Sequence, residues 1–197
     1  FGADNSAGLT AGGTAATADE VAIFNPVNKT YKFYFYQNAG LGGTGWRSPS
    51  DRFADASGTI LYPGEALIII RKESDDLSLS LSGSVNTVPG YVPIENGFNA
   101  IASTFPLAVS LNEFFGPSGG LAQGGSTAAT ADEIITVDSD GDFQFYYYQD
   151  GGLGGSGWRS PKDRFFDVGD LPLITSGSGI YYRRRGEAFN FFQSVPF

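Results

Sequence analysis

The residues most capable of chemistry in this chain lie in a glycine-rich stretch that occurs twice. Residues 40–53 and 152–165 both follow the pattern Gly-Leu-Gly-Gly-x-Gly-Trp-Arg-Ser-Pro-x-Asp-Arg-Phe, and fifteen of the twenty positions in 36–55 are identical to those in 148–167. A glycine loop binds phosphate when it joins a strand to the N-terminus of a helix. Neither stretch is followed by a helical pattern or contains the lysine of a P-loop. The sequence therefore favours a structural loop over a phosphate site.

Within each loop, the tryptophan and the arginine are expected to hold the loop in place. Trp46 and Trp158 are predicted to plug the loops onto the core, while the glycines permit the positive φ angles of a tight Ω-like loop. Arg47 and Arg159 are predicted to pair with acids at identical spacing in the two copies. These acids are Asp51 or Asp55 in the first copy and Asp163 or Asp167 in the second.

The composition limits what catalysis is possible. The chain contains no His and no Cys, so it cannot form a Ser-His-Asp triad, a thiolate nucleophile or a His-based zinc site. A paired-carboxylate glycosidase stays formally open. Its cleft would normally be asymmetric, however, whereas these carboxylates recur with the repeat. We therefore expect no enzyme, no catalytic residues and no cofactor.

Two acidic features are candidates for calcium. Asp138, Asp140 and Asp142 are spaced like the start of a calcium loop, but the final Glu and the following helix of an EF-hand are missing. A β-turn is the favoured interpretation there. The duplicated acidic pairs at 19–20 and 132–133 leave open a calcium ion at the start of a strand, and nothing in the sequence supports it. We expect no metal site.

The net charge and the composition of the chain limit its possible partners and location. The 197-residue chain has 12 basic and 21 acidic residues, a net charge of −9, which argues against nucleic acid and anionic membranes as partners. The longest apolar stretch, 66–70, is far too short to span a bilayer, so we expect no membrane insertion. The absence of Cys, His and Met, with abundant Gly, Ser, Thr, Tyr and Phe, indicates an extracellular or cell-surface protein. No signal peptide is present, so we expect the processed form.

The repeat sets the predicted architecture. Short β-branched and aromatic runs predict paired strands at 21–24 and 134–137, 31–36 and 143–148, and 64–72 and 177–185. Further strands are expected at 77–81, 98–107 and 189–197, a linker at 86–96, and one short helical turn at 110–115. The fold class is therefore all-β, with two tandem antiparallel β-sandwich or barrel-like modules from an internal repeat. We place these modules at 1–90 and 91–197.

The aromatic strands have two faces. Alternation puts Tyr31, Phe33 and Phe35 on the side predicted to be core, and the second copy follows the same pattern. The opposite side is predicted to reach water or a partner. It carries Tyr34, Tyr36, Tyr146 and Tyr148, and with the two tryptophans it has the chemistry of either a sugar-stacking platform or a protein contact.

Several motifs resemble a family of uncharacterised, secreted, β-rich repeat proteins found as large paralogous sets in environmental bacteria. The matching features are Gly97-Phe98-Asn99 with Phe105-Pro106, Ala131-Asp132-Glu133, the Tyr-rich strand followed by Gly-Trp-Arg, and a Gly-x-x-x-Ile-x-Arg strand. The resemblance covers most of both copies. It implies export and no known activity, and it supplies no catalytic residues.

The two ends of the chain complete the prediction. The second copy opens with the strand at 98–107, which has no equivalent in the first copy, so the first module should expose an apolar groove. The C-terminal residues 189–197 resemble that strand in part. We predict that they fill this groove, most plausibly in a neighbouring subunit, with these residues making the contact: Phe189, Phe191, Phe192, Val195 and Phe197.

Three alternatives stay open at the sequence level: an ordinary final strand like 77–85, closure within one chain, and a missing strand that lies upstream of residue 1. Complementation between chains would be head-to-tail and need not close, so it builds a fibre. We therefore expect an extracellular structural protein that self-assembles into a fibre or surface layer and whose partners are other copies of itself. The alternative is a carbohydrate-binding or adhesive module that binds glycans with its Tyr/Trp face.

Overall fold

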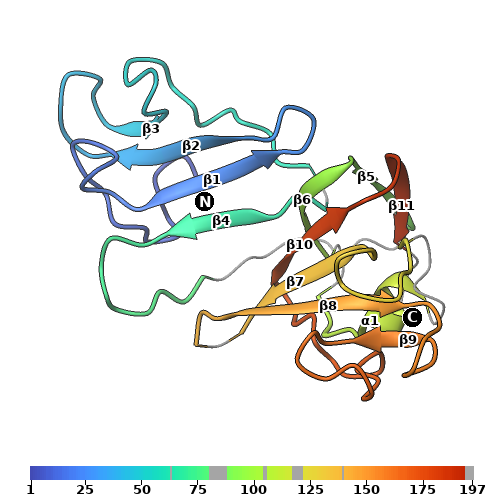
Figure 1. The fold of residues 1–197 in the computed structure, drawn as a ribbon. Helices are drawn as coiled ribbons and strands as arrows, with labels where there is room; N and C mark the ends of the chain where they lie inside the picture. The colour runs from blue at the N-terminus through green and yellow to red at the C-terminus, as the bar shows by residue number, and fades with distance from the viewer. Residues whose placement is uncertain (63, 80–87, 104–105, 117–121, 139, 194–197) are drawn as a thin grey trace. The chain divides into compact units, whose positions relative to one another are not determined.

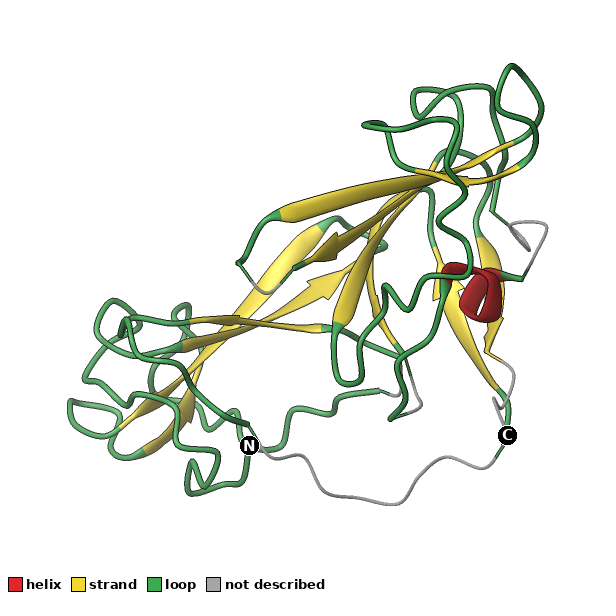
Figure 2. Ribbon diagram, turned by 90° about the horizontal axis from the view of Figure 1, so that it is seen from below, coloured by secondary structure: helices red, strands yellow, loops and turns green. Residues whose placement is uncertain are grey.

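A computed structural model describes residues 1–62, 64–79, 88–103, 106–116, 122–138 and 140–193. Figure 2 shows that the regular secondary structure is nearly all strand, joined by long loops, with one short helix. The chain divides into two compact units. The first contains Phe1–Asn25, Thr30–Tyr62 and Leu67–Ser84, and the second contains Pro26–Lys29, Pro63–Ala66 and Val85–Phe197. The prediction of an almost wholly antiparallel β fold is confirmed.

The first unit is built on a four-stranded antiparallel sheet in the order β3-β2-β1-β4 (Figure 1). The long central strands consist of β-branched and aromatic residues, which favour a pleated, half-buried surface. Cross-strand pairs such as Val21 with Tyr34 and Phe24 with Tyr31 join β1 to β2. The strands are β1 (Glu20–Asn25), β2 (Thr30–Gln37), β3 (Gly45–Arg47) and β4 (Leu67–Ile70).

The second unit contains a five-stranded antiparallel sheet in the order β6-β10-β7-β8-β9 and a separate two-stranded sheet of β5 and β11. One five-residue helix, α1 (Leu111–Phe115), accompanies them. The strands are β5 (Gly90–Ile94), β6 (Gly97–Ala102), β7 (Glu133–Val137), β8 (Phe143–Gln149), β9 (Gly157–Arg159), β10 (Gly179–Arg184) and β11 (Phe189–Gln193).

The repeated sequence stretches pair in the same order in both units. The order β3-β2-β1-β4 of the first sheet corresponds to β9-β8-β7-β10 in the second. The register corresponds too, because Tyr36 lies opposite Trp46 and Tyr148 lies opposite Trp158. The second sheet has one additional strand, β6, which pairs with the edge of β10 opposite to β7.

The short helix was predicted correctly, and its cause is local. Ser110 caps the N-terminus: its hydroxyl accepts a hydrogen bond from the backbone N–H of Glu113 (3.1 Å). The Glu113 carboxylate in turn accepts from the backbone N–H of Ser110 (2.7 Å). This reciprocal capping box satisfies two N–H groups that a helix start leaves unpaired. Leu111 and Phe115 then point into the core.

The two units differ sharply in how well their cores are covered. The core cluster of the first unit has three buried members, Leu9, Val21 and Trp46. In the second unit, buried residues from β6, α1, β5 and β11 join those of the sheet. Described residues of the first unit form no counterpart to these four elements. The cluster of the second unit comprises Val92, Ile94, Ile101, Val109, Leu111, Phe115, Ile134, Tyr146, Trp158, Val168, Ile174, Ile180, Tyr182 and Phe191.

Two predicted segments differ from the structure. The linker expected at 86–96 contains strand β5, in which Val92 and Ile94 are buried while Tyr91 is exposed. Pro93 fits there because β5 pairs with a strand along one edge only, so no hydrogen-bond donor is needed on the other. The strand expected at 77–81 is not formed by residues 77–79, and residues 80–81 lie outside the described part of the chain.

The predicted core face of the aromatic strands was largely wrong. Phe143 and Phe145 are 55% and 43% exposed, and Tyr31 is 41% exposed; of the predicted face, Phe35 and Tyr147 are fully buried. The core instead packs against the opposite side of the sheet, because that side also carries Val21 and the tryptophan in the first unit. The tyrosines predicted to be outside therefore face the core, and they are Tyr34, Tyr36, Tyr146 and Tyr148.

Candidate functional site

The arginine of the first glycine-rich loop is buried, and it forms its hydrogen bonds and its ion pair within the loop. Arg47 is 7% exposed. Its Nη2 donates to the carbonyl oxygen of Gly42 (2.8 Å), and its Nη1 donates to that of Trp46 (2.9 Å). The same Nη1 forms an ion pair with Asp55 at 3.4 Å. The guanidinium thus organises the loop backbone and does not point at solvent as a ligand site would.

The second loop repeats this arrangement. Arg159, 3% exposed, donates to the carbonyl oxygens of Gly154 (2.9 Å) and Trp158 (3.0 Å) and pairs with Asp167 at 3.1 Å. Arginine suits this role because its planar fork presents several donors in fixed geometry. The predicted pairing within the loop holds for Asp55 and Asp167.

The other two acids proposed as partners, Asp51 and Asp163, have a different role. Asp51 Oδ1 accepts hydrogen bonds from the backbone N–H groups of Phe53 (3.0 Å) and Ala54 (3.1 Å), and these two bonds lower the pKa of Asp51. Asp163 accepts equivalent bonds from residues 165 and 166. Both acids therefore close the turn that follows the Ser-Pro pair.

A buried glutamine and a glycine complete each loop. The Nε2 of Gln37 donates to the carbonyl oxygen of Gly43 (2.8 Å), and Gln149 does the same to Gly155 (2.9 Å). Gly42 must be glycine, because a Cβ there would collide with the carbonyl oxygen of residue 52. The close approach of two backbone segments explains why the sequence keeps glycine at this point in both loops.

The aromatic side chains predicted to form a sugar platform are core residues. Trp46 is 6% exposed and Trp158 is fully buried. Each packs edge-on against a tyrosine of the neighbouring strand, with ring centroids 5.6 Å apart for Tyr36 and for Tyr148. Trp46 also donates from Nε1 to the carbonyl oxygen of Gly2 (2.7 Å). Neither tryptophan therefore presents an exposed flat ring on which a sugar could stack.

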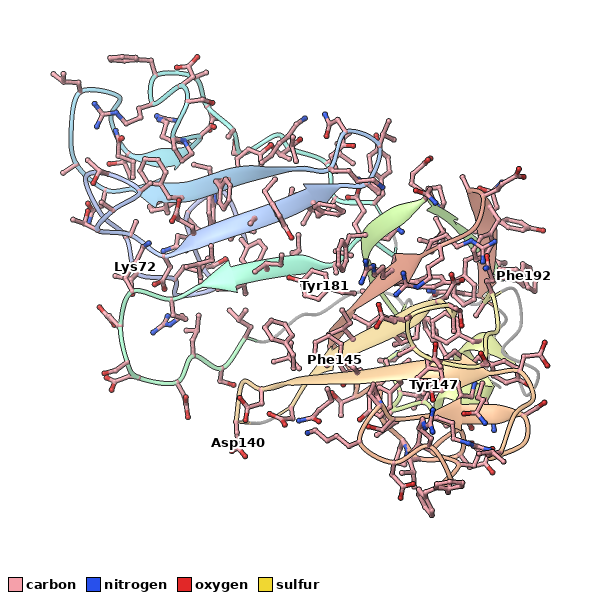
Figure 3. All side chains as sticks on the ribbon, in the orientation of Figure 1. Lys72, Asp140, Phe145, Tyr147, Tyr181 and Phe192 are labelled. Carbon is pink, nitrogen blue, oxygen red and sulfur yellow. The ribbon has the colours of Figure 1, made fainter. Side chains whose placement is uncertain are left out.

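The structure reveals a buried aspartate at the start of β1 whose role the sequence did not show. Asp19 is fully buried. One carboxylate oxygen accepts from the backbone N–H of Thr10 (2.8 Å) and from Arg71 Nη1 (2.7 Å), and the other accepts from the backbone N–H of Lys72 (2.8 Å). Lys72 lies just beyond the end of β4 (Figure 3). Asp19 therefore ties the N-terminal segment to the end of β4.

Asp132 forms the same anchor in the second unit. It accepts from the backbone N–H groups of Gln123 (2.8 Å) and Arg185 (2.7 Å) and from Arg184 Nη1 (2.7 Å). The hydroxyl of Tyr182 adds a fourth donor at 2.7 Å. In both units the aspartate and its arginine are 52 positions apart in sequence. That repeated separation was the one signal from which the pair could have been found.

The anchor keeps its aspartate ionised. Burial alone would raise the pKa of Asp19, but the backbone N–H donors of Lys72 and Thr10 and the positive charge of Arg71 outweigh it and lower that pKa. Burial and the neighbouring Asp132 charge raise the pKa of the Tyr182 hydroxyl far above its ordinary value. Tyr182 is therefore a neutral donor to Asp132 at any physiological pH.

The acidic calcium candidates are explained by these internal bonds. The oxygens of Asp19 and Asp132 are occupied by arginine and backbone donors. In the β7–β8 turn, Asp138 accepts from the backbone N–H groups of Asp140 (3.1 Å) and Asp142 (2.9 Å) and from a glutamine side chain. The described residues include no group of three or more acids, His or Cys arranged to hold a metal ion.

In the first unit, the described residues leave one strand edge and one pocket uncovered. Strand β4 pairs with β1 along one edge, and no described strand pairs with its other edge. The equivalent edge of β10 is occupied by β6. Beside this sheet lies a pocket of about 210 Å³, and Phe1 covers part of the Trp46 ring at a centroid distance of 5.9 Å. Apolar residues that line the pocket include Val21, Ile23, Tyr34, Trp46, Ala56 and Leu61.

The described part of the C-terminal tail lies in the second unit and not in this pocket. Strand β11 pairs antiparallel with β5, and Phe191, 4% exposed, packs against Phe114 and Phe115 at centroid distances of 5.1 and 5.2 Å. Phe192 is 44% exposed and projects away from β11 (Figure 3). Phe189 is half-buried. Val195 and Phe197 lie outside the described residues.

The similarity between the tail and the strand at 98–107 does not extend to the structure. Asn99 is buried and bonds to the backbone of Glu95 through both its Oδ1 and its Nδ2, at 2.8 Å each. Asn190, its counterpart in the sequence comparison, is exposed. The two strands therefore present opposite sides to the core, and the tail is held as the partner of β5.

No protein-family model, curated protein or solved structure matches the chain. The resemblance to secreted β-rich repeat proteins stays a prediction from the sequence. Among the residues that the structure describes, no helix is long and apolar enough to cross a membrane.

The two arginines of the first loop should respond differently to removal. Arg47→Ala deletes a buried guanidinium that bonds to carbonyl groups, and we expect the free energy of unfolding to fall by about 2–4 kcal/mol. Arg52→Ala removes an exposed side chain and should change it by less than about 0.5 kcal/mol. Urea unfolding followed by fluorescence measures both. Equal effects would show that Arg47 does not hold the loop.

The anchor predicts acid sensitivity. Because the pKa of Asp19 is lower in the folded state, its contribution is fully present above about pH 4 and is lost as pH falls through the folded pKa. Asp19→Asn should lower the free energy of unfolding at pH 7 by about 3 kcal/mol, since it leaves Arg71 without its buried partner. It should also weaken the loss of stability between pH 4 and pH 2. Asp140→Asn, at an exposed turn, is the control; a similar loss there would contradict the anchor.

Proposed function

We propose that this chain is an extracellular structural protein that assembles with copies of itself by strand complementation at the first unit. The observation that carries the proposal is the edge of β4, which no described strand covers, beside an apolar sheet face with three buried core residues. An uncovered edge presents a row of backbone N–H and C=O groups that can pair with another chain. In the second unit, the equivalent edge of β10 is covered by another strand.

There, β6 pairs with six residues of β10 and contributes Ile101 to the core. A strand added to β4 would supply the same two things to the first unit: backbone hydrogen bonds along the edge and apolar cover for the half-buried Leu67 and Ile69. Complete burial of an exposed side chain of this size contributes roughly 1.5–3 kcal/mol, and covering these half-buried ones contributes part of that. Strand addition is a common way for proteins to bind an extended segment.

The donor we propose is the C-terminal strand of a neighbouring copy. Strand β11 pairs with β5 along one edge, and no described strand pairs with its other edge. Edge-to-edge addition of β11 to β4 leaves the β5 pairing and the packing of Phe191 intact. Strand β11 has five residues and β4 has four, so the two are of similar length. The exposed Phe192, which packs on Tyr91 at 5.2 Å, would then lie at the junction.

Because β4 and β11 are different surfaces, such a contact is heterologous and need not close, so it can extend from copy to copy. The expected product is a fibre. The absence of Cys, His and Met supports an extracellular location for it, and the lack of a catalytic constellation in the described residues supports a structural role over an enzymatic one. Other copies of the chain are the partners in this proposal.

We also propose that the two units are two copies of one module. Four shared features support this: the strand order, the register of the tryptophan pairs, the arginine-centred loop and the buried aspartate anchor. The second copy would then begin near residue 90, where β5 starts. A chain with a second copy that provides β11 and a first copy with an uncovered β4 edge can act as both strand donor and strand acceptor.

A charged side chain on β4 should stop the assembly. Ile68→Lys places a lysine on the outer side of the exposed edge, where charges prevent strand pairing. We expect purified chain to form fibres at high concentration and this variant to form no fibres, as seen by electron microscopy.

Tyr181→Lys is the matched control. Tyr181 occupies the equivalent position on β10, which is paired on both edges, so fibres should persist. Fibres from the Ile68→Lys protein would overturn the proposal. A monomeric wild-type chain whose fluorescence responds to glycans would favour the carbohydrate-binding alternative.

A further inference from the structure

The tips of the two glycine-rich loops expose the same apolar residues in both units. Leu41 is 88% exposed and Leu153 is 92% exposed. The phenylalanines later in the loops match as closely, with Phe53 at 68% and Phe165 at 70%. Large apolar side chains that are almost fully solvated contribute little to the stability of their own unit.

Several of the other identical residues of the loops have a structural reason for their identity. The arginine, tryptophan, glutamine and acid side chains of both loops bond to the loop backbone or fill the core, and Gly42 is required by a close backbone approach. The tip residues have no such reason, yet they are the same in both copies. In the second unit, Leu153, Arg164 and Phe165 border a shallow pocket of about 230 Å³. We call the exposed leucine and phenylalanine of each loop its loop tip: Leu41 with Phe53, and Leu153 with Phe165.

The loop tips are electrically neutral in an acidic chain. Residues 38–55 and 150–167 together contain five basic and five acidic side chains, so the whole net charge of −9 resides outside them. Two copies of this chain repel each other through their net charge. At the loop tips, like-charged copies therefore approach each other at a low electrostatic cost.

We propose that the loop tips are contact sites between copies of this chain, each tip packing against a tip of another copy. The occupant is a second copy because the tip is neutral, apolar and present twice in each chain. This inference rests on the proposed self-assembly and deepens it. The β4 edge extends a fibre, and the loop tips join neighbouring fibres side by side into bundles or a layer.

Two tips in one chain make a definite prediction about valency. A copy with both tips intact can join two neighbours and continue a chain of contacts, whereas a copy with one tip can join one neighbour and stops at a dimer. Association should also strengthen as salt screens the net repulsion, since the Debye length falls from about 10 Å at 0.1 M to about 3 Å at 1 M.

The experiment uses the full chain in the Ile68→Lys background, so that pairing at β4 does not contribute. Sedimentation velocity compares three proteins: intact tips, one altered tip (Leu41→Ser with Phe53→Ser), and two altered tips (adding Leu153→Ser with Phe165→Ser). We expect oligomers beyond the dimer, dimers only, and monomers, respectively. The control, Ile60→Ser with Leu107→Ser, removes exposed apolar residues outside the tips and should behave like the first protein.

Two results would overturn the inference. One is an unchanged distribution of oligomers after both tips are altered. The other is a monomer at every salt concentration that instead binds vesicles of phosphatidylcholine and phosphatidylglycerol through intact tips.

Electron microscopy separates this failure from failure of the proposed function. With Ile68 restored, the protein with two altered tips should form single fibres without bundles. Bundles that persist would contradict the loop-tip contact alone, whereas fibres that survive Ile68→Lys would contradict the proposed function alone.

Discussion

The fold of each unit depends on one buried carboxylate, which needs hydrogen-bond donors to compensate its charge. An ionised aspartate placed out of contact with water is costly unless charged and hydrogen-bonding partners compensate it. Asp19 meets this demand with an arginine and two backbone N–H groups contributed by segments more than fifty positions apart. The bond from Thr10 fixes the N-terminal segment against the sheet, where Gly12 forms a bridge with Gln37. Gln37 in turn holds the glycine-rich loop, so the anchor supports the loop through a short series of contacts.

The same series recurs in the second unit, from Asp132 through Gln123 and Gly125 to Gln149 and its loop. What differs is the cover over the apolar side of the sheet. The second unit adds a strand, a helix and a two-stranded ribbon, and its buried cluster is several times larger. The first unit keeps the scaffold but exposes an edge and a pocket. A shared scaffold with unequal cover is the physical basis of the assembly that we propose.

The sequence predicted those parts of the fold whose causes are local. The β-branched and aromatic runs predicted β1, β2, β7 and β8, and one short helical turn was predicted at 110–115, where α1 forms behind the Ser110–Glu113 capping box. The loop arginines were predicted to bond within their loops because their spacing from acids and glycines repeats. These features need only neighbouring residues to form, so a periodic or spaced pattern is enough to find them.

The missed features depend on contacts that are distant in sequence. Alternation separates the two faces of β2 and β8, but both faces are aromatic, and only the position of the core decides between them. Strand β5 was taken for a linker because Gly90 and Pro93 are typical of loops, whereas pairing with β11 makes it a strand. Three-residue β3 and β9 are too short for any periodic pattern. The Asp19–Arg71 pair joins residues that no local pattern connects.

The central claim is that the edge of β4 is open in the single chain and covered after assembly. Hydrogen exchange of the backbone amides in β4 and β10, compared between dilute and assembled protein, tests it most directly. The account predicts slow exchange in β10 in both states, because β6 and β7 flank it. In β4 it predicts faster exchange in the dilute chain and strong protection after assembly. Assembly that leaves exchange in β4 unchanged would contradict the account.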